Sequence, residues 1–395
     1  MSSTSILPVA KEQFLIRPDL TFLNHGSFGA CPRPVFEVYQ EWQRRLEADP
    51  VEFLGRRLDD LLREAREPLA AYVGTQVDQI VYVQNATLGF NIVARSLMLT
   101  LEPGDEVLAT DHEYGAADRT WRFLCTQYGV KYINQPIPLP LTSDEEMIEA
   151  LWRGVTPRTR VIFISHITSP TALIFPVEKI CQRAQAAGIM TVIDGAHAPG
   201  HIPLQLDAMG ADFYTGNCHK WLCAPKGAGF LYARPERQSL LQPLVVSWGW
   251  DSRSPGASPF QDYFSWTGTD DPASFLSVPA AIAFQQQYDW DAVRIACHEL
   301  ASSARWDISV LAGTMPICLD SPHWFGQMCA IPLPIEDAPA LQKRLREEWH
   351  IEIPIFPWNG LRLLRISIQG YNGPDDVERL VTALEAIFSD HSAPF

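Results

Sequence analysis

Short apolar runs alternate with longer stretches of helical periodicity over the first two thirds of the chain. Helical spacing is clearest over 35–72, where apolar residues recur three and four positions apart and the pattern breaks near 49–50. Further helices are predicted at 87–97, 116–128 and 177–187. Runs rich in β-branched residues predict strands at 80–83, 106–109, 131–133, 160–164, 190–193, 213–215 and 229–232. This alternation predicts an α/β domain with a mainly parallel, seven-stranded sheet.

The order of elements changes beyond residue 272. Two long helices are predicted at 273–288 and 290–311, followed by a strand at 329–333 and a helix at 338–349. Strands at 351–355 and 363–368 and a helix at 375–388 complete the chain. We therefore expect a large α/β domain over 20–271 and a smaller α+β domain formed by 1–19 and 272–395.

Charge and hydropathy exclude several classes of function. Lys and Arg number 31 against 46 Asp and Glu, a net charge of −15, which disfavours binding of nucleic acid or an anionic membrane through a general basic surface. No apolar run approaches the roughly 18 residues that a membrane-spanning helix needs. The first ten residues lack the pattern of a secretory signal. These features predict a soluble, cytoplasmic protein.

Cysteine and histidine spacing gives no sign of a disulfide framework or a metal site. The eight cysteines are scattered, with no C-x-x-C pair, and are expected to be reduced thiols. His197 and His201 are four residues apart, but Pro199 disfavours the helix that would place both on one face. We expect no metal.

Polar residues follow several of the predicted strands, at the edge where α/β sheets bind ligands. Asp194 ends an apolar strand, which suits either a ligand cation or a structural ion pair. Ala86 and Thr87 open a helix, either as an ordinary helix start or as a phosphate cradle. Lys220 lies among apolar residues and is either a solvated surface lysine or one whose amine pKa is lowered by desolvation, which would allow it to form a Schiff base. Together these are the groups that a pyridoxal phosphate site requires.

The motifs around these residues resemble a known family. Asp194-Gly195-Ala196-His197, followed by Gly216-Asn217-Cys218-His219-Lys220-Trp221, resembles the signature of class V, fold type I, pyridoxal-phosphate enzymes. The segments 23–29, 113–116, 165–173, 358–360 and 365–367 are most similar to the isopenicillin N epimerase-like group. The resemblance spans nearly the whole chain and implies the fold of that family, with pyridoxal 5′-phosphate as cofactor.

The resemblance also implies roles for individual residues. Lys220 would carry the cofactor, Asp194 would partner its ring nitrogen, and His197 would lie near the ring. The phosphate would be held by Ala86, Thr87, Asn217 and His219. Tyr114 would cover the other face of the ring, with His112 as the second candidate.

Substrate and subunit contacts follow from the same resemblance. Arg365 would bind the substrate α-carboxylate, for which its planar fork is suited, although a structural ion pair is the alternative. Asn24 and His25 would approach the substrate from the N-terminal loop. Thr269 would reach the phosphate of a neighbouring subunit, which implies a homodimer with shared active sites.

Several reactions are compatible with these residues. The leading hypothesis is an amino-acid epimerase or racemase, in which Lys220 removes the α-proton and Tyr114 or His25 is the second base. A carbon-sulfur lyase and an aminotransferase are the alternatives, and a catalytically silent dimeric partner is a further possibility that no residue supports. A desulfurase that forms a persulfide is disfavoured, because 353–360 contains no cysteine.

Overall fold

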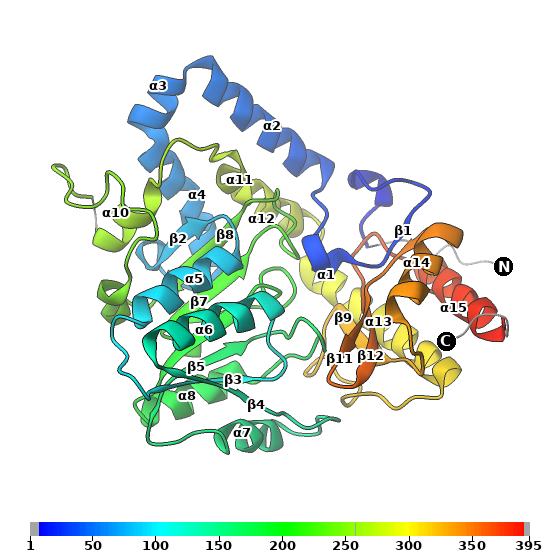
Figure 1. The fold of residues 1–395 in the computed structure, drawn as a ribbon. Helices are drawn as coiled ribbons and strands as arrows, with labels where there is room; N and C mark the ends of the chain where they lie inside the picture. Colours follow the sequence, from blue (N-terminus) through cyan, green and yellow to red (C-terminus); the bar gives the residue numbers. More distant parts are fainter. Residues whose placement is uncertain (1–7, 257, 391–395) are drawn as a thin grey trace.

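A seven-stranded sheet forms the centre of the computed structural model, which describes residues 8–256 and 258–390 (Figure 1). Its order is β2-β8-β7-β6-β5-β3-β4, and β8 is antiparallel to both neighbours while the other pairs are parallel. The strands are β2 (Ile80–Val83), β3 (Glu106–Thr110), β4 (Lys131–Gln135), β5 (Thr159–Ser165), β6 (Met190–Gly195), β7 (Phe213–Asn217) and β8 (Gly229–Ala233). The predicted mainly parallel sheet is therefore confirmed.

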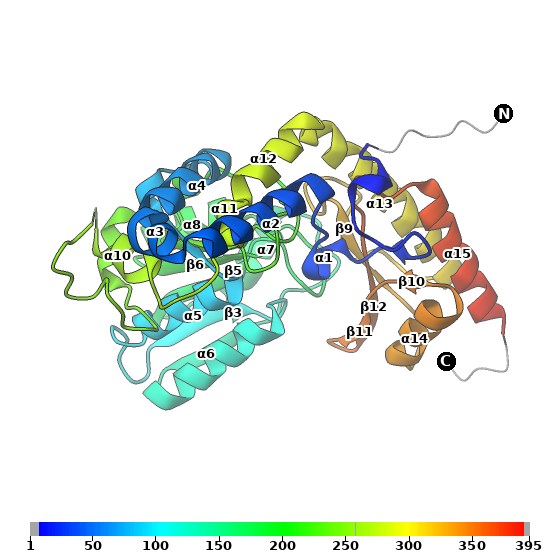
Figure 2. The same cartoon turned by 90° about the horizontal axis from the view of Figure 1, so that it is seen from above.

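Helices cover both faces of this sheet, which explains why its strands are continuous apolar runs (Figure 2). In β5, Val161 and Phe163 belong to the core beneath α5 (Ala86–Leu97) and α6 (Gly115–Tyr128). Ile162 and Ile164 belong to the opposite core, with α7 (Asp144–Trp152) and α8 (Val177–Ala186). The short helix α9 (Leu206–Met209) precedes β7. Successive residues of a strand point to opposite faces, so one apolar run supplies both cores.

The N-terminal helices form a long arm beside the sheet (Figure 1). The break predicted near 49–50 is present, because Asp49 caps a new helix by accepting a hydrogen bond from the Glu52 N–H at 3.1 Å. The elements are η1 (Lys11–Gln13), β1 (Thr21–Phe22), α1 (His25–Phe28), α2 (Arg33–Ala48), α3 (Pro50–Glu52), a π-helical turn η2 (Phe53–Arg57), α4 (Leu58–Val73) and η3 (Val77–Gln79).

The helix predicted over 273–288 is two helices, α11 (Ala273–Leu276) and α12 (Val278–Gln287). Pro279 lies in the first turn of α12 and has no N–H to continue the hydrogen bonding of α11. Both helices pack against α2, and both also contact α4. The segment before them contains η4 (Pro235–Leu240) and α10 (Pro259–Ser265), and α13 (Trp290–Ala312) follows.

A three-stranded antiparallel sheet lies beside the large one, in the order β11-β12-β9. Its strands are β9 (Met328–Pro332), β11 (Ile355–Trp358) and β12 (Leu361–Ser367), and α14 (Ala338–Glu348) and α15 (Pro374–Ser389) complete the chain. The single strand predicted over 351–355 is wrong. β10 (Ile351–Glu352) pairs with β1, whereas Ile355 begins β11, and Pro354 between them lacks the N–H that a continuous ladder requires.

None of the helices within 8–256 and 258–390 combines the length and the apolar character needed to cross a bilayer.

Candidate active site

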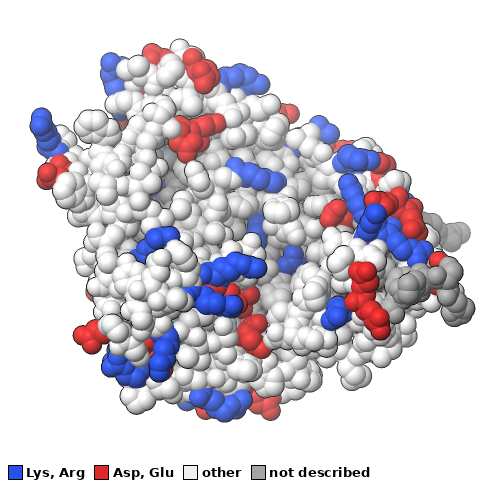
Figure 3. Space-filling model, in the orientation of Figure 1, with Lys and Arg blue, Asp and Glu red and all other residues white. Residues whose placement is uncertain are grey.

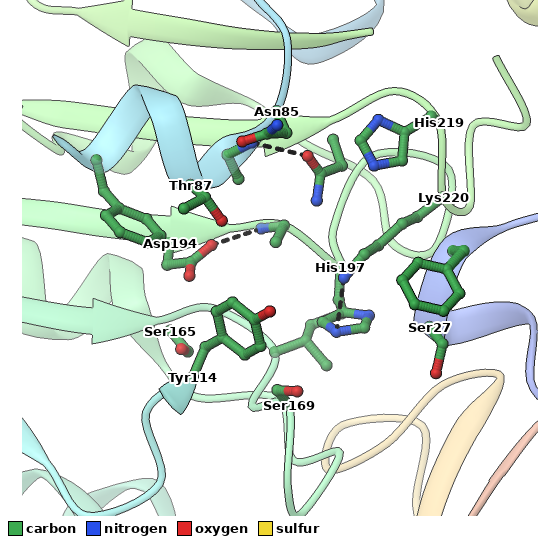
Figure 4. Close-up of a pocket in the computed structure, with 16 residues that line it drawn as sticks. Ser27, Asn85, Thr87, Tyr114, Ser165, Ser169, Asp194, His197, His219 and Lys220 are labelled. Atoms are coloured by element: carbon green, nitrogen blue, oxygen red, sulfur yellow. Dashed lines mark hydrogen bonds between the residues drawn. The ribbon is translucent and has the colours of Figure 1, made fainter. Parts of the chain in front are cut away.

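The polar residues that follow the strands of the large sheet meet in one cavity (Figure 4). Asn85 follows β2, Asp194 lies at the end of β6, and Asn217 ends β7. Figure 3 shows this face hollowed between the large and small sheets, with several Lys and Arg side chains in and beside the hollow. The cavity is lined by Ser27, Phe28, Asn85, Ala86, Thr87, Phe90, Tyr114, Ser165, Ile167, Ser169, Asp194, Ala196, His197, Asn217, His219 and Lys220.

Lys220 points into the cavity toward His197 (Figure 4). Its Nζ lies 3.2 Å from His197 Nε2, and the Trp221 indole N–H donates to His197 Nδ1 at 3.2 Å. An indole nitrogen can only donate, so Nδ1 of His197 is an acceptor and the neutral ring carries its proton on Nε2. That proton points at Lys220 Nζ, which accepts it only as a neutral amine.

Electrostatics favour the same protonation states. Burial lowers the pKa of Lys220 to about 7, the positive charge of Arg365 acts in the same direction, and the carboxylate of Asp194 opposes both. Burial also holds the pKa of His197 well below its usual range, so the ring is neutral. Lys220 is therefore available as a nucleophile near neutral pH.

Asp194 presents a carboxylate with spare hydrogen-bonding capacity. The residue is 3% exposed, and its Oδ1 accepts the Ala196 N–H at 2.9 Å. Among the described residues no other group donates a hydrogen bond to it. Burial raises the pKa of Asp194. A buried carboxylate with one neutral donor fits a cationic group of a ligand.

The start of α5 leaves one backbone donor free at the cavity. Asn85 caps the helix through the Leu88 N–H at 2.9 Å, and the Ala86 N–H donates to Asn217 Oδ1 at 2.8 Å. The Thr87 N–H has no acceptor within the part of the chain that the structure describes. Asn217 therefore orients the helix start, and Thr87 is left to bind an anion at the positive end of α5.

His219 lines the cavity beside this helix start (Figure 4). Its Nδ1 bonds the Ala228 carbonyl at 2.9 Å, which assigns the proton of the neutral ring to Nδ1. Burial lowers the pKa of His219 to about 4. A phosphate dianion nearby would raise that pKa and favour the doubly protonated ring, which can donate from Nε2.

Tyr114 and His112, the two candidates for covering a bound ring, are placed differently. Tyr114 precedes α6, is 44% exposed and has its ring at the cavity (Figure 4). His112 is fully buried outside the cavity, with Nδ1 2.7 Å from the Thr171 hydroxyl and its ring 4.5 Å from that of Trp358. Tyr114 is thus the aromatic residue of this loop that can contact a ligand.

Glu113 has a structural role at the cavity that the sequence did not reveal. Its carboxylate accepts the Thr110 hydroxyl at 2.6 Å and the Ser165 hydroxyl and N–H at 2.6 and 2.8 Å. Burial raises its pKa to about 8. Glu113 ties the loop that carries Tyr114 to the end of β5. The only sequence signal was its position beside Tyr114.

Arg365 lies behind two serines that line the cavity. Its guanidinium donates from Nη1 to the Ser169 carbonyl at 2.6 Å and from Nη2 to the Ser27 hydroxyl at 3.2 Å. Arg365 is 5% exposed, and its Nε has no hydrogen-bond partner among the described residues. Burial lowers its pKa to about 10. No carboxylate within the described chain pairs with it, which argues against the structural ion pair. Neither serine was singled out from the sequence.

Besides His112 and Arg365, three further expected site residues do not line the cavity. His25 is fully buried, with Nδ1 3.0 Å from the Tyr371 hydroxyl and Nε2 3.1 Å from the Lys220 carbonyl. Both ring nitrogens are occupied, so His25 supports the Lys220 loop from behind and does not face the substrate side. Asn24 accepts the Ser27 hydroxyl at 2.5 Å and reaches the cavity only through that residue. Thr269 is exposed on the loop between α10 and α11.

Known proteins are similar in sequence to this chain over nearly its whole length. Isopenicillin N epimerase of Amycolatopsis lactamdurans is 36% identical over 389 residues, which cover 96% of this chain and 98% of that protein. The probable chloroplastic L-cysteine desulfhydrase of Arabidopsis thaliana is 28% identical, over 94% of this chain and 84% of that protein.

The fold matches that of a solved structure, the enzyme C-DES with glycine covalently linked to its pyridoxal phosphate cofactor. The TM-score is 0.82 at 20% identity, over 93% of this chain and 97% of the other. The large sheet with its helices and the small sheet thus form the expected fold type I architecture. The profile of the family described as aminotransferase class-V matches residues 29–380. The chain belongs to the aminotransferase class-V family.

Proposed function

We propose that the chain is an enzyme that binds pyridoxal 5′-phosphate in this cavity and acts at the α-carbon of an amino acid, as an epimerase or racemase. The observation that carries the proposal is the neutral Lys220 amine, held 3.2 Å from His197 in the cavity that also contains Asp194. The 36% identity to isopenicillin N epimerase over nearly the whole chain supports this reaction.

The residues present fit the cofactor. Lys220 would attach it, and the carboxylate of Asp194 has the spare oxygen that a ring N–H⁺ requires. Thr87, oriented through Ala86 and Asn217, would bind the phosphate together with His219. His197 and Tyr114 would contact the ring from opposite sides. When bound, pyridoxal phosphate withdraws electrons from the substrate α-carbon, so that a proton there can be removed.

The protein supplies the proton transfers and the orientation. The pKa of about 7 allows Lys220 Nζ to take a proton and to release it near neutral pH. Of the two candidates for the second base, His25 has both ring nitrogens engaged and its pKa is lowered by burial to about 3. Tyr114 borders the cavity, and its hydroxyl is therefore our candidate for the second proton transfer.

Arg365 would orient the substrate through its α-carboxylate. The unpaired Nε and the two Nη groups that contact Ser27 and Ser169 provide the donors for this contact. A carboxylate held in a bidentate contact keeps the α-carbon at a set angle to the ring, which decides the bond that breaks.

A carbon-sulfur lyase is the second candidate, supported by the 28% identity to the Arabidopsis protein. The same proton removal would expel a sulfur leaving group from the β-carbon. A nucleophilic cysteine is disfavoured in this chain, since 353–360 contains none and burial raises the pKa of Cys318 to about 11. An aminotransferase is the third alternative and would depend on an added keto acid.

Assembly, domain division and location belong to the same proposal. Thr269 is exposed and does not line its own cavity, as expected of a residue that contacts the phosphate of a neighbouring subunit. We propose a homodimer with shared active sites, a large domain over 20–271 and a small one formed by 1–19 and 272–395, of which 1–7, 257 and 391–395 lie outside the described residues. We place the protein in the cytoplasm, with an amino-acid-like small molecule as its substrate.

Borohydride reduction followed by peptide mapping tests the attachment of the cofactor. The cofactor is expected on the peptide that contains Lys220, and Lys220→Ala should lose both the attachment and turnover. Retained turnover in Lys220→Ala would refute the mechanism. Chiral separation of the products with L-amino acids then separates the candidates: a D-isomer indicates an epimerase, and pyruvate with released thiol indicates a lyase.

A further inference from the structure

The tip of the β11–β12 hairpin in the small sheet contacts the loop after β3 in the large sheet. Asn359 Nδ2 donates to Asp111 Oδ2 at 2.7 Å, and the Trp358 indole N–H donates to the Asp111 carbonyl at 3.2 Å. The Trp358 ring lies 4.5 Å from that of His112. We call the contact of Asp111 with Asn359 and Trp358 the hairpin contact.

Both partners are held for this contact by their own elements. Asp111 Oδ1 accepts the Ile137 N–H at 3.0 Å, which leaves Oδ2 for Asn359. Asn359 has φ 42° and Gly360 φ 82°, so the two form a tight turn with both residues in the left-handed region. Asparagine tolerates this conformation better than most residues, and its amide projects from the turn as a donor.

The hairpin contact joins the two elements that carry the proposed ligand contacts. The loop that starts at Asp111 ends at Tyr114, and the hairpin carries Arg365 on β12. The strands of the hairpin are paired from Ile355↔Leu364 to Trp358↔Leu361, and the Arg365 N–H donates to the Pro354 carbonyl at 3.1 Å. A displacement of the hairpin tip is therefore transmitted to Arg365.

We infer that Asp111 and Asn359 are positioning residues, whose hydrogen bond sets the position of Arg365 relative to Tyr114 for binding of the substrate carboxylate. This inference rests on the proposed function. Neither Asp111 nor Asn359 lines the cavity. Their effect is on the geometry across the boundary between the two sheets. The hydrogen bonds of Arg365 to Ser27 and Ser169 tie Arg365 to α1 and to the segment after β5, but not to the loop that carries Tyr114.

A charge exchange between the two residues tests the inference. Asn359→Asp places a second carboxylate against Asp111 and repels the hairpin tip, whereas Asp111→Asn combined with Asn359→Asp restores a donor and an acceptor in exchanged positions. Asn359→Gly is a milder variant, because glycine keeps the left-handed turn and removes the amide without adding a charge. The probe is 2-aminoisobutyrate, which has an amine and a carboxylate but no α-proton, so it binds without turnover.

The measurement is the apparent Kd of 2-aminoisobutyrate, followed by the absorbance of the cofactor-loaded protein, alongside the Kd of pyridoxal phosphate itself. Asn359→Asp should raise the Kd of 2-aminoisobutyrate by about tenfold, because the hydrogen bond to the Asp111 carboxylate is replaced by repulsion between two carboxylates. The double variant should return to within about twofold of the starting protein, Asn359→Gly should lie between, and the cofactor Kd should stay unchanged.

An unchanged probe Kd in Asn359→Asp, or a double variant no better than the single one, would overturn the inference. If Asn359→Asp does not load with cofactor, Asn359→Gly decides, and a probe Kd equal to that of the starting protein then overturns the inference as well. Failure of the starting protein to bind pyridoxal phosphate at Lys220 would instead refute the proposed function, so the two failures are distinguishable.

Discussion

The amine of Lys220 should be reactive at a pH where ordinary lysines are not. Its pKa falls from 10.5 to about 7, because it is buried and lies near the charge of Arg365. At pH 7 a lysine with the ordinary pKa is neutral in about 0.03% of molecules, whereas a lysine with a pKa of about 7 is neutral in about half of them. The fraction of neutral amine is therefore roughly a thousandfold larger. Arg365→Gln removes the repelling charge and should move the pKa of Lys220 upward.

The assay is pulsed labelling of the cofactor-free protein with fluorodinitrobenzene across a pH series, with each lysine quantified by peptide mass spectrometry. Labelling of Lys220 should rise with pH with a midpoint near 7, and the midpoint should be higher in Arg365→Gln. Lys179, whose pKa is raised by hydrogen bonds to Asp144 and Glu145, is an internal control that should label only at high pH. A Lys220 midpoint near 10 would refute the argument from burial and charge.

Three further predictions rest on the same geometry. Gly29→Ala should lower both the melting temperature and cofactor loading, because the φ of Gly29 is 71° and a Cβ there would meet the backbone of the Lys220 loop. Thermal melts of the variant with and without cofactor measure both effects. Burial lowers the pKa of His25 and of His201 to about 3, so both rings are neutral in the folded protein and take up protons on unfolding below pH 6.5. The free energy of unfolding, measured in urea, should therefore fall as the pH drops from 6.5 toward 3. Thr269→Glu and Lys220→Ala should each be inactive alone. Dimers that contain one subunit of each variant should regain up to half the activity, because one of their two sites combines an intact Lys220 with an intact Thr269. No recovery on mixing would contradict shared sites.

The sheet could be predicted from the sequence because each of its central strands is buried on both faces. In β5 the continuous run Val161 to Ile164 serves two cores, and an apolar run of this length is typical of a strand that helices cover on both sides. The residues after the strands could be brought together by the rule that carboxyl ends of parallel strands share an edge. That rule predicts that Asp194 and Lys220 lie at the same edge of the sheet, and both line the cavity.

Loop residues could not be placed by the same argument, because their direction depends on local hydrogen bonds. His112 turns inward to Thr171, and His25 turns toward Tyr371, so neither faces the cavity. Ser27 and Ser169, which do approach Arg365, lie in two of the segments that carry the resemblance, but a serine hydroxyl is common in any loop and does not by itself indicate this contact.

The central claim is that this cavity breaks and re-forms the α-hydrogen bond of an amino acid. Proton NMR of the cofactor-loaded protein in deuterated water, with a panel of L-amino acids that includes cysteine and cystine, follows that hydrogen directly. We predict loss of the α-proton signal with the side chain intact, followed by the D-isomer, and neither change in Lys220→Ala. An α-proton that persists for every amino acid tested would contradict the account, and pyruvate with released sulfur would replace the epimerase with a carbon-sulfur lyase.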